Sequence, residues 1–146
     1  MGQLNLPLRG LVYLDSDALI YLVEKIQPYS GLLLPLLQAV KAGPLQLVGS
    51  ELLLLETLVK PVEQGDQRLE ADFRRFLTSS RDMNLIPISQ VVLEQALVLR
   101  VQHRLRTPDS IHAATALLAP AALFVTNDPA FRRVSGLAVA LRDDCI

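Results

Sequence analysis

Short apolar segments of strand-forming residues alternate with helical patterns along this chain, and no other feature constrains its fold as strongly. Strands are predicted at 10–14, 45–49, 83–88 and 121–125, and the segment 137–141 can form a fifth. Helices are predicted at 18–24, 32–41, 51–60, 63–80, 90–104 and 109–119. Connections of this length suit crossovers between parallel strands. The sequence therefore predicts a three-layer α/β/α fold, with a mostly parallel central sheet of four to five strands flanked by helices.

Helix-end residues mark several of these boundaries. Ser16 or Asp17 can cap the helix 18–24. Ser50 can cap the helix 51–60, which Pro61 is expected to end. In the stretch before 109–119, Thr107 and Pro108 are typical of an N-cap and of the first helical position.

The composition is that of one apolar-rich domain spanning 1–146. Hydrophobic residues make up 51% of the 146 residues, and no apolar run reaches the roughly 18 residues that a membrane helix needs. We therefore expect a cytoplasmic protein with no signal peptide, whose apolar surplus fills a core and an oligomer interface. The net charge of −1 argues against a strongly basic nucleic-acid module. Cys145 is the single cysteine, which excludes an intrachain disulfide.

Four acidic residues stand where the fold would bring them to one site. Asp15 directly follows the segment 10–14, and Asp128 follows 121–125, so a parallel sheet points both to the edge where ligands bind. Asp109 lies in the first turn of its helix, where a carboxylate can also serve the helix dipole alone. Glu56 lies among leucines and needs a partner, and Lys60, four residues on, is the simplest one.

Carboxylates gathered in this way repel one another unless a cation lies between them. Oxygen ligands of this kind suit Mg²⁺ or Mn²⁺. Such an ion can polarise a phosphoryl oxygen and lower the pKa of bound water. The four acids therefore indicate metal-assisted hydrolysis of a phosphodiester.

Four motifs in this chain resemble those of PIN-domain nucleases, in the same order and spacing. They read VYLDSDALI at 12–20, SELLLLE at 50–56 with Lys60 and Pro61 following, TPDSIHAATA at 107–116 and TNDPAF at 126–131. The third is the most specific of the set. By size and motif wording, the chain is most similar to the VapC-type toxins of bacterial and archaeal toxin–antitoxin pairs.

The resemblance implies a Mg²⁺- or Mn²⁺-dependent endoribonuclease that cleaves RNA, forms a homodimer and binds a cognate antitoxin protein. It implies a catalytic site of Asp15, Glu56, Asp109 and Asp128, with Asp15, Asp109 and Asp128 as metal ligands. Thr126 would be a supporting polar residue. Asp17 stands where the family commonly has Asn. It can add charge to the site or cap the helix, and capping is the favoured interpretation.

Basic residues and a histidine lie close to Asp109 in the sequence. Arg100, Arg104 and Arg106 are candidate contacts for RNA phosphates, although cations also suit the end of the preceding helix. His112 shares a helix face with Asp109. It could bond a carboxylate or a phosphate, but a structural bond to a backbone carbonyl is the more frequent role of such a histidine.

Two other functions compete with the nuclease. A haloacid-dehalogenase-like phosphatase would use Asp15 and Asp17 as its paired aspartates, but it needs a later lysine, and none follows Lys60. A catalytically silent PIN fold would serve only for binding. The intact set of acids argues against that second alternative.

Overall fold

The computed structural model describes residues 4–141, and its sheet is entirely parallel. Its strands are β1 (Gly10–Leu14), β2 (Leu45–Ser50), β3 (Met83–Ile86), β4 (Leu123–Thr126) and β5 (Val139–Leu141). They lie in the order β3-β2-β1-β4-β5, and every neighbouring pair is parallel. The predicted fold is confirmed, and the segment near the C-terminus does form the fifth strand. Cys145 lies outside the described residues.

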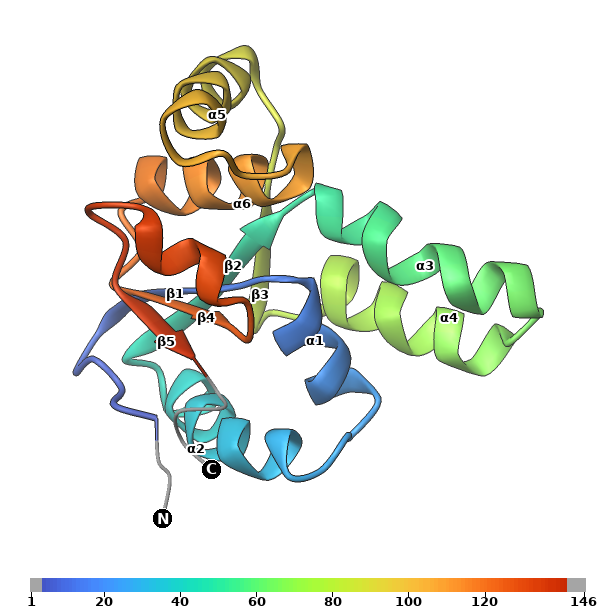
Figure 1. Ribbon diagram of the computed structural model, residues 1–146. Helices are drawn as coiled ribbons and strands as arrows, with labels where there is room; N and C mark the ends of the chain where they lie inside the picture. The colour runs from blue at the N-terminus through green and yellow to red at the C-terminus, as the bar shows by residue number, and fades with distance from the viewer. Residues whose placement is uncertain (1–3, 142–146) are drawn as a thin grey trace.

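Helices cover both faces of this sheet (Figure 1). They are α1 (Ser16–Val23), α2 (Tyr29–Ala42), α3 (Leu52–Gln64), α4 (Gln67–Arg74), α5 (Gln90–His103) and α6 (Thr107–Leu118). One core cluster joins the sheet to α1 and α2, and a second joins its other face to α5 and α6. The hairpin of α3 and α4 projects to one side (Figure 1). Within residues 4–141, none of the helices has the length and apolar character needed to cross a membrane.

Strand β1 shows why the sheet needs helices on both sides. Val12 and Leu14 are fully buried in the cluster with α1 and α2, whereas Tyr13 is fully buried in the cluster with α5 and α6. Successive side chains of a strand point to opposite faces. A strand that is apolar on both faces is typical of a covered parallel sheet.

The strand order places the ends of β1 and β4 side by side. Leu14 of β1 pairs with Val125 of β4, and the backbone N–H of Asp15 donates to the Val125 carbonyl at 3.4 Å. Asp15 and Thr126 therefore emerge together at the carboxyl edge of the central strands. This edge is where ligands bind in open parallel sheets.

Three helix caps differ from the sequence prediction. Glu51, not Ser50, is the N-cap of α3, although Ser50 Oγ accepts from the Leu52 N–H at 3.0 Å. Asp15 itself caps α1, since its side chain accepts a hydrogen bond from the Ala18 N–H. Neither Ser16 nor Asp17 is the cap, because the helix begins directly after Asp15. Arg106 rather than Thr107 occupies the N-cap of α6, with extended backbone angles, so Thr107 is already helical.

The predicted break at Pro61 is also wrong. Pro61 lies inside α3, which continues to Gln64 and ends at Gly65 in the left-handed conformation that glycine adopts readily. Asp66 then caps α4 by accepting from the Leu69 N–H. The predicted helix 63–80 is thus divided among the end of α3, α4 and a π-helical turn, Arg75–Ser79.

Candidate active site

All four predicted catalytic acids line one cavity of about 150 Å³ at the carboxyl edge of the sheet. Asp15 follows β1, Asp128 follows β4, Glu56 comes from α3 and Asp109 from α6. Asp17, in the first turn of α1, lines the same cavity. Segments far apart in sequence therefore converge on one acidic cavity.

Asp15 is the most deeply buried of these acids, with 5% of its surface exposed. Its Oδ1 accepts from the Ala18 N–H at 3.1 Å, and its Oδ2 accepts a hydrogen bond from the Thr126 hydroxyl. Both carboxylate oxygens are therefore held by donors on rigid elements, one at a helix start and one at a strand end.

Burial raises the pKa of Asp15 from its ordinary value of 3.8 to about 6. The bonds from Thr126 and from the Ala18 N–H oppose this rise, and the negative charge of Asp17 adds to it. Asp15 is therefore an acid whose charge is costly in the folded protein, so a cation beside it would be strongly favoured.

Thr126 connects Asp15 to Asp128. Its fully buried hydroxyl donates to Asp15 and accepts from the Asp128 backbone N–H at 3.0 Å. The Asp128 side chain accepts from the Ala130 N–H at 2.9 Å and so caps a short 3₁₀ turn, Pro129–Arg133. The position of Asp128 is thus also fixed by the backbone.

Asp109 is held by a side chain instead. Arg106 Nε lies 2.9 Å from Asp109 Oδ2, and Arg106 Nη2 lies 3.5 Å from Asp109 Oδ1 and 4.0 Å from Asp128 Oδ2. The bond to Asp109 raises the pKa of Arg106 above its ordinary value. The Arg106 side chain is 77% exposed, whereas that of Asp109 is only 13% exposed. The exposed guanidinium of Arg106 thus compensates the charge of the nearly buried Asp109 carboxylate.

Glu56 pairs with His112, not with Lys60 as the simplest sequence interpretation had it. His112 Nε2 lies 2.6 Å from Glu56 Oε1, and His112 Nδ1 lies 2.6 Å from the Tyr13 hydroxyl. His112 and Tyr13 are buried, whereas the Glu56 side chain is 23% exposed. The histidine therefore links the core to an acid of the cavity, and its partners are side chains, not a backbone carbonyl.

The three arginines proposed to contact RNA occupy different places. Only Arg106 lines the cavity. Arg100 donates to the Leu105 carbonyl at 2.6 Å, across the turn between α5 and α6. Arg104 is exposed and ends α5 in a left-handed conformation.

The chain matches the family model described as PIN domain over residues 12–137. This chain belongs to the PIN-domain family. A comparison with curated protein sequences gives no match.

This PIN domain is similar to several solved structures. A Rickettsia felis VapBC2 structure, bound to a DNA fragment from its promoter, shares 18% identity at a TM-score of 0.72, covering 90% of this chain and 98% of the other. A Klebsiella pneumoniae toxin–antitoxin complex shares 25% identity at a TM-score of 0.64, covering 88% and 95%. VapBC-5 from Mycobacterium tuberculosis shares 20% identity at 0.57, covering 92% and 98%.

The donor chemistry of the PIN-domain cavity fits a hard divalent cation. Five carboxylates line it, and carboxylate oxygens are the ligands that Mg²⁺ and Mn²⁺ prefer. Among residues 4–141, no group of three or more His, Cys, Asp or Glu side chains is placed to hold a metal in the arrangement described. The guanidinium of Arg106 supplies positive charge beside Asp109 and Asp128 in this arrangement.

The ion pair of Arg106 with Asp109 and the contact of His112 with Tyr13 were not predicted, whereas a bond from His112 to a carboxylate was one of the alternatives. The spacing of Arg106 and Asp109, three residues apart across a helix start, could have indicated their ion pair. No local pattern could have indicated the contact of His112 with Tyr13, because 99 positions separate them.

Proposed function

We propose that this PIN domain is a Mg²⁺- or Mn²⁺-dependent endoribonuclease, the toxin of a toxin–antitoxin pair that acts in the cytoplasm. The observation that carries the proposal is the convergence of Asp15, Glu56, Asp109 and Asp128 on one cavity. Asp15, Asp109 and Asp128 would hold the ion. When bound, the ion would polarise a phosphoryl oxygen and lower the pKa of a water ligand.

The protein's own residues divide the remaining work. Thr126 and the Ala18 N–H fix the two oxygens of Asp15. We assign to Glu56, which lines the cavity, the role of accepting a proton from the attacking water. Arg106, which lines the cavity, is the proposed contact for the RNA backbone, because guanidinium groups bind phosphate in a bidentate manner.

The direct test is cleavage of a mixed-sequence single-stranded RNA by the purified, antitoxin-free protein. Cleavage within the strand is expected with Mg²⁺ or Mn²⁺ and is expected to stop with a chelator. Glu63→Gln is a suitable control for Glu56→Gln, since Glu63 is an exposed acid on the same helix. Metal-independent cleavage, or equal cleavage by Asp15→Ala, would contradict the proposal. Absence of Mn²⁺ binding together with absence of cleavage would favour the silent binding module.

The phosphatase alternative receives no support from the cavity. In the described part of the chain, the residues that line it include no lysine, and the PIN-domain match covers the motifs on which the alternative depended. A covalent phosphate on Asp15 would be needed to revive it.

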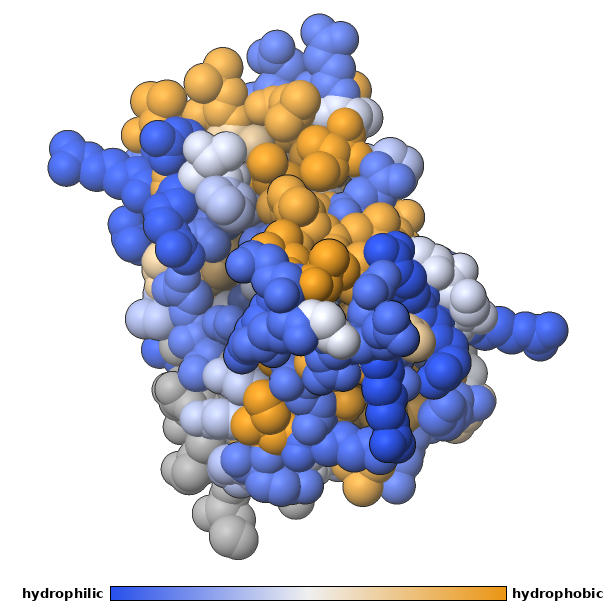
Figure 2. Space-filling model, turned by 90° about the vertical axis from the view of Figure 1, so that its right-hand side faces the viewer, coloured by the Kyte–Doolittle hydropathy of each residue, from blue (hydrophilic) through white to orange (hydrophobic). Residues whose placement is uncertain are grey.

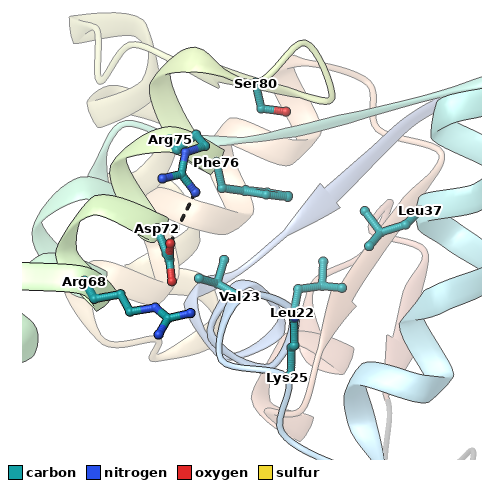
Figure 3. Close-up of a pocket in the computed structure, with 9 residues that line it drawn as sticks. All are labelled: Leu22, Val23, Lys25, Leu37, Arg68, Asp72, Arg75, Phe76 and Ser80. Atoms are coloured by element: carbon teal, nitrogen blue, oxygen red, sulfur yellow. Dashed lines mark hydrogen bonds and ion pairs between the residues drawn. The ribbon is translucent and has the colours of Figure 1, made fainter.

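A separate groove of about 470 Å³ suits the antitoxin partner (Figure 3). Its apolar lining consists of Leu22, Val23, Leu37 and Phe76, and its charged lining consists of Lys25, Arg68, Arg75 and Asp72. Arg75 pairs with Asp72, as the dashed line in Figure 3 marks, so Lys25 and Arg68 leave the groove net positive. We propose that it binds an antitoxin segment with apolar anchors and acidic flanks.

The antitoxin proposal is tested with the product of the neighbouring reading frame. Arg68→Glu is expected to weaken its binding at least about tenfold, because reversal of charge opposes an acidic partner. Arg133→Glu is the matched control, since Arg133 is exposed, donates to the His103 carbonyl and does not line the groove. Equal binding by the Arg68 variant and the wild type would overturn this placement.

The proposed homodimer would use the apolar surface of α5. Exposed apolar residues of this helix are Val91, Leu93, Leu97, Val98 and Val101, and α3 adds Leu55, Val59 and Val62. Figure 2 shows apolar side chains gathered over the upper part of the face that it presents. Sedimentation is expected to give twice the chain mass for the wild type and the chain mass for Val101→Asp. A monomeric wild type would contradict the dimer.

A further inference from the structure

Three residues from three different elements form a continuous chain of hydrogen-bonding groups that ends at the active-site cavity. Tyr13 comes from β1, His112 from α6 and Glu56 from α3. The distances are 2.6 Å from the Tyr13 hydroxyl to His112 Nδ1 and 2.6 Å from His112 Nε2 to Glu56 Oε1. Buried polar groups arranged in this way restrict one another's orientation.

The buried end of this chain is rigid. The Tyr13 ring is fully buried, stacks on Phe124 with centroids 4.9 Å apart and meets the His112 ring edge-on at 5.7 Å. Phe124 in turn packs against Phe131. The imidazole of His112 is only 2% exposed, so the side chains packed around it restrict its orientation.

The Tyr13 hydroxyl lies 2.6 Å from His112 Nδ1. A phenol O–H can donate a hydrogen bond to a ring nitrogen that carries no proton. The ring proton then lies on Nε2, which donates to the Glu56 carboxylate.

We propose that His112, oriented by Tyr13, is the positioning residue that holds Glu56 at the edge of the cavity. His112 Nε2 donates to Glu56 Oε1 and so holds the carboxylate in one orientation. This inference rests on the proposed nuclease function, because Glu56 matters only if it accepts a proton in cleavage. It gives His112 and Tyr13, which are not among the acids of the site, a role in orienting Glu56.

The decisive comparison is between two substitutions of His112. His112→Gln places an amide N–H near the former Nε2, whereas His112→Leu has similar bulk and no donor. We expect His112→Leu to lower kcat for RNA cleavage about 10- to 100-fold with KM within twofold, and His112→Gln to restore most of the loss. We also expect the double variant Glu56→Gln/His112→Leu to cleave no more slowly than Glu56→Gln alone.

A spectroscopic readout tests the hydrogen-bonded chain independently of cleavage. The chain has two histidines, so His103→Gln leaves the ¹⁵N signals of His112 alone and also serves as the matched control for activity. These signals should show Nε2 as a protonated, hydrogen-bonded nitrogen, and Tyr13→Phe should shift the Nδ1 signal. An Nε2 that carries no proton, or no change in Tyr13→Phe, would overturn the proposal.

The nuclease function and the positioning role of His112 can be refuted separately. Wild-type protein that does not cleave RNA with Mg²⁺ or Mn²⁺ would refute both the nuclease and the role of Glu56. Wild-type cleavage with an equally active, folded His112→Leu would refute only the positioning role. If His112→Leu does not fold, Tyr13→Phe decides, because it keeps the stacked ring and removes the hydroxyl. Unchanged kcat in that variant would overturn the proposal.

Discussion

The two halves of the acidic cavity are built in different ways. Asp15 and Asp128, which follow β1 and β4, are held by backbone N–H groups of Ala18 and Ala130 and by the buried Thr126 hydroxyl. Asp109 and Glu56, which come from helices, are held by the side chains of Arg106 and His112. The strand half is thus fixed by the fold itself, whereas the helix half depends on side-chain partners. Substitutions should separate the two halves.

The largest expected effect is on catalysis, and it should be shared by both halves. Asp15→Asn and Asp109→Asn are each expected to lower kcat for RNA cleavage at least about 100-fold, since loss of a ligand exceeds loss of a supporting residue. Their stabilities should differ. Only Asp15→Asn removes a charge whose burial is costly. Urea unfolding at pH 8 checks this contrast, which fails if both variants lose the same stability.

The second effect is the pH dependence of folding, and it belongs to the strand half. Because burial raises the pKa of Asp15 to about 6, its protonated form favours the folded state. This stabilisation is complete below the ordinary pKa of 3.8 and is lost as the pH rises through about 6. The rise corresponds to about 3 kcal/mol.

The test is the free energy of unfolding of the wild type and of Asp15→Asn from pH 4 to pH 8. The wild type should lose stability relative to the variant across this range. A difference that is independent of pH would show that Asp15 is not desolvated as described.

The third effect tests the hydroxyl that joins Asp15 to Asp128. Thr126→Val keeps the shape and removes the hydroxyl, so it should cost about 1–3 kcal/mol of stability and about 10- to 100-fold in kcat. Thr126→Ser should recover most of both. If valine is tolerated in both assays, the strand half is held by its backbone contacts alone.

The smallest effect concerns the exposed cation of the helix half. Arg106→Ala removes a positive charge that competes with a metal ion for Asp109, so Mn²⁺ should bind a few-fold more tightly. Arg81→Ala is the control, because it removes the same charge at the opposite end of the sheet. Weaker Mn²⁺ binding by the Arg106 variant would instead indicate that the arginine supports the metal site.

The difference between the two halves of the cavity also explains what could be predicted from the sequence. The strand half follows from local patterns, since an apolar run that ends in Asp15 already places that carboxylate at the sheet edge. The strand order and the burial of Thr126 depend on tertiary packing, which local patterns do not show. The resemblance to the family motifs nevertheless predicted that Asp15 and Asp128 belong to one site. Local rules failed at Pro61, which α3 accommodates inside the helix and which therefore does not end it.

The helix half was predicted only in part. Glu56 and Asp109 were predicted to share a site, and both line the cavity. The only pairing partner that the helix pattern offered for Glu56 was Lys60, because such a pattern shows contacts only three or four residues apart. His112 of α6 reaches Glu56 of α3 across 56 positions, and α6 packs against β2. Such contacts are set by the tertiary fold, which periodicity does not encode.

The central claim is that acids from both halves hold one divalent ion, and calorimetric titration with Mn²⁺ tests it most directly. The wild type and Glu63→Gln should bind Mn²⁺ equally, and Asp15→Asn and Asp109→Asn should each weaken binding at least about tenfold. Binding that is lost in only one of these variants, or is unchanged in both, would contradict a single site built from the two halves.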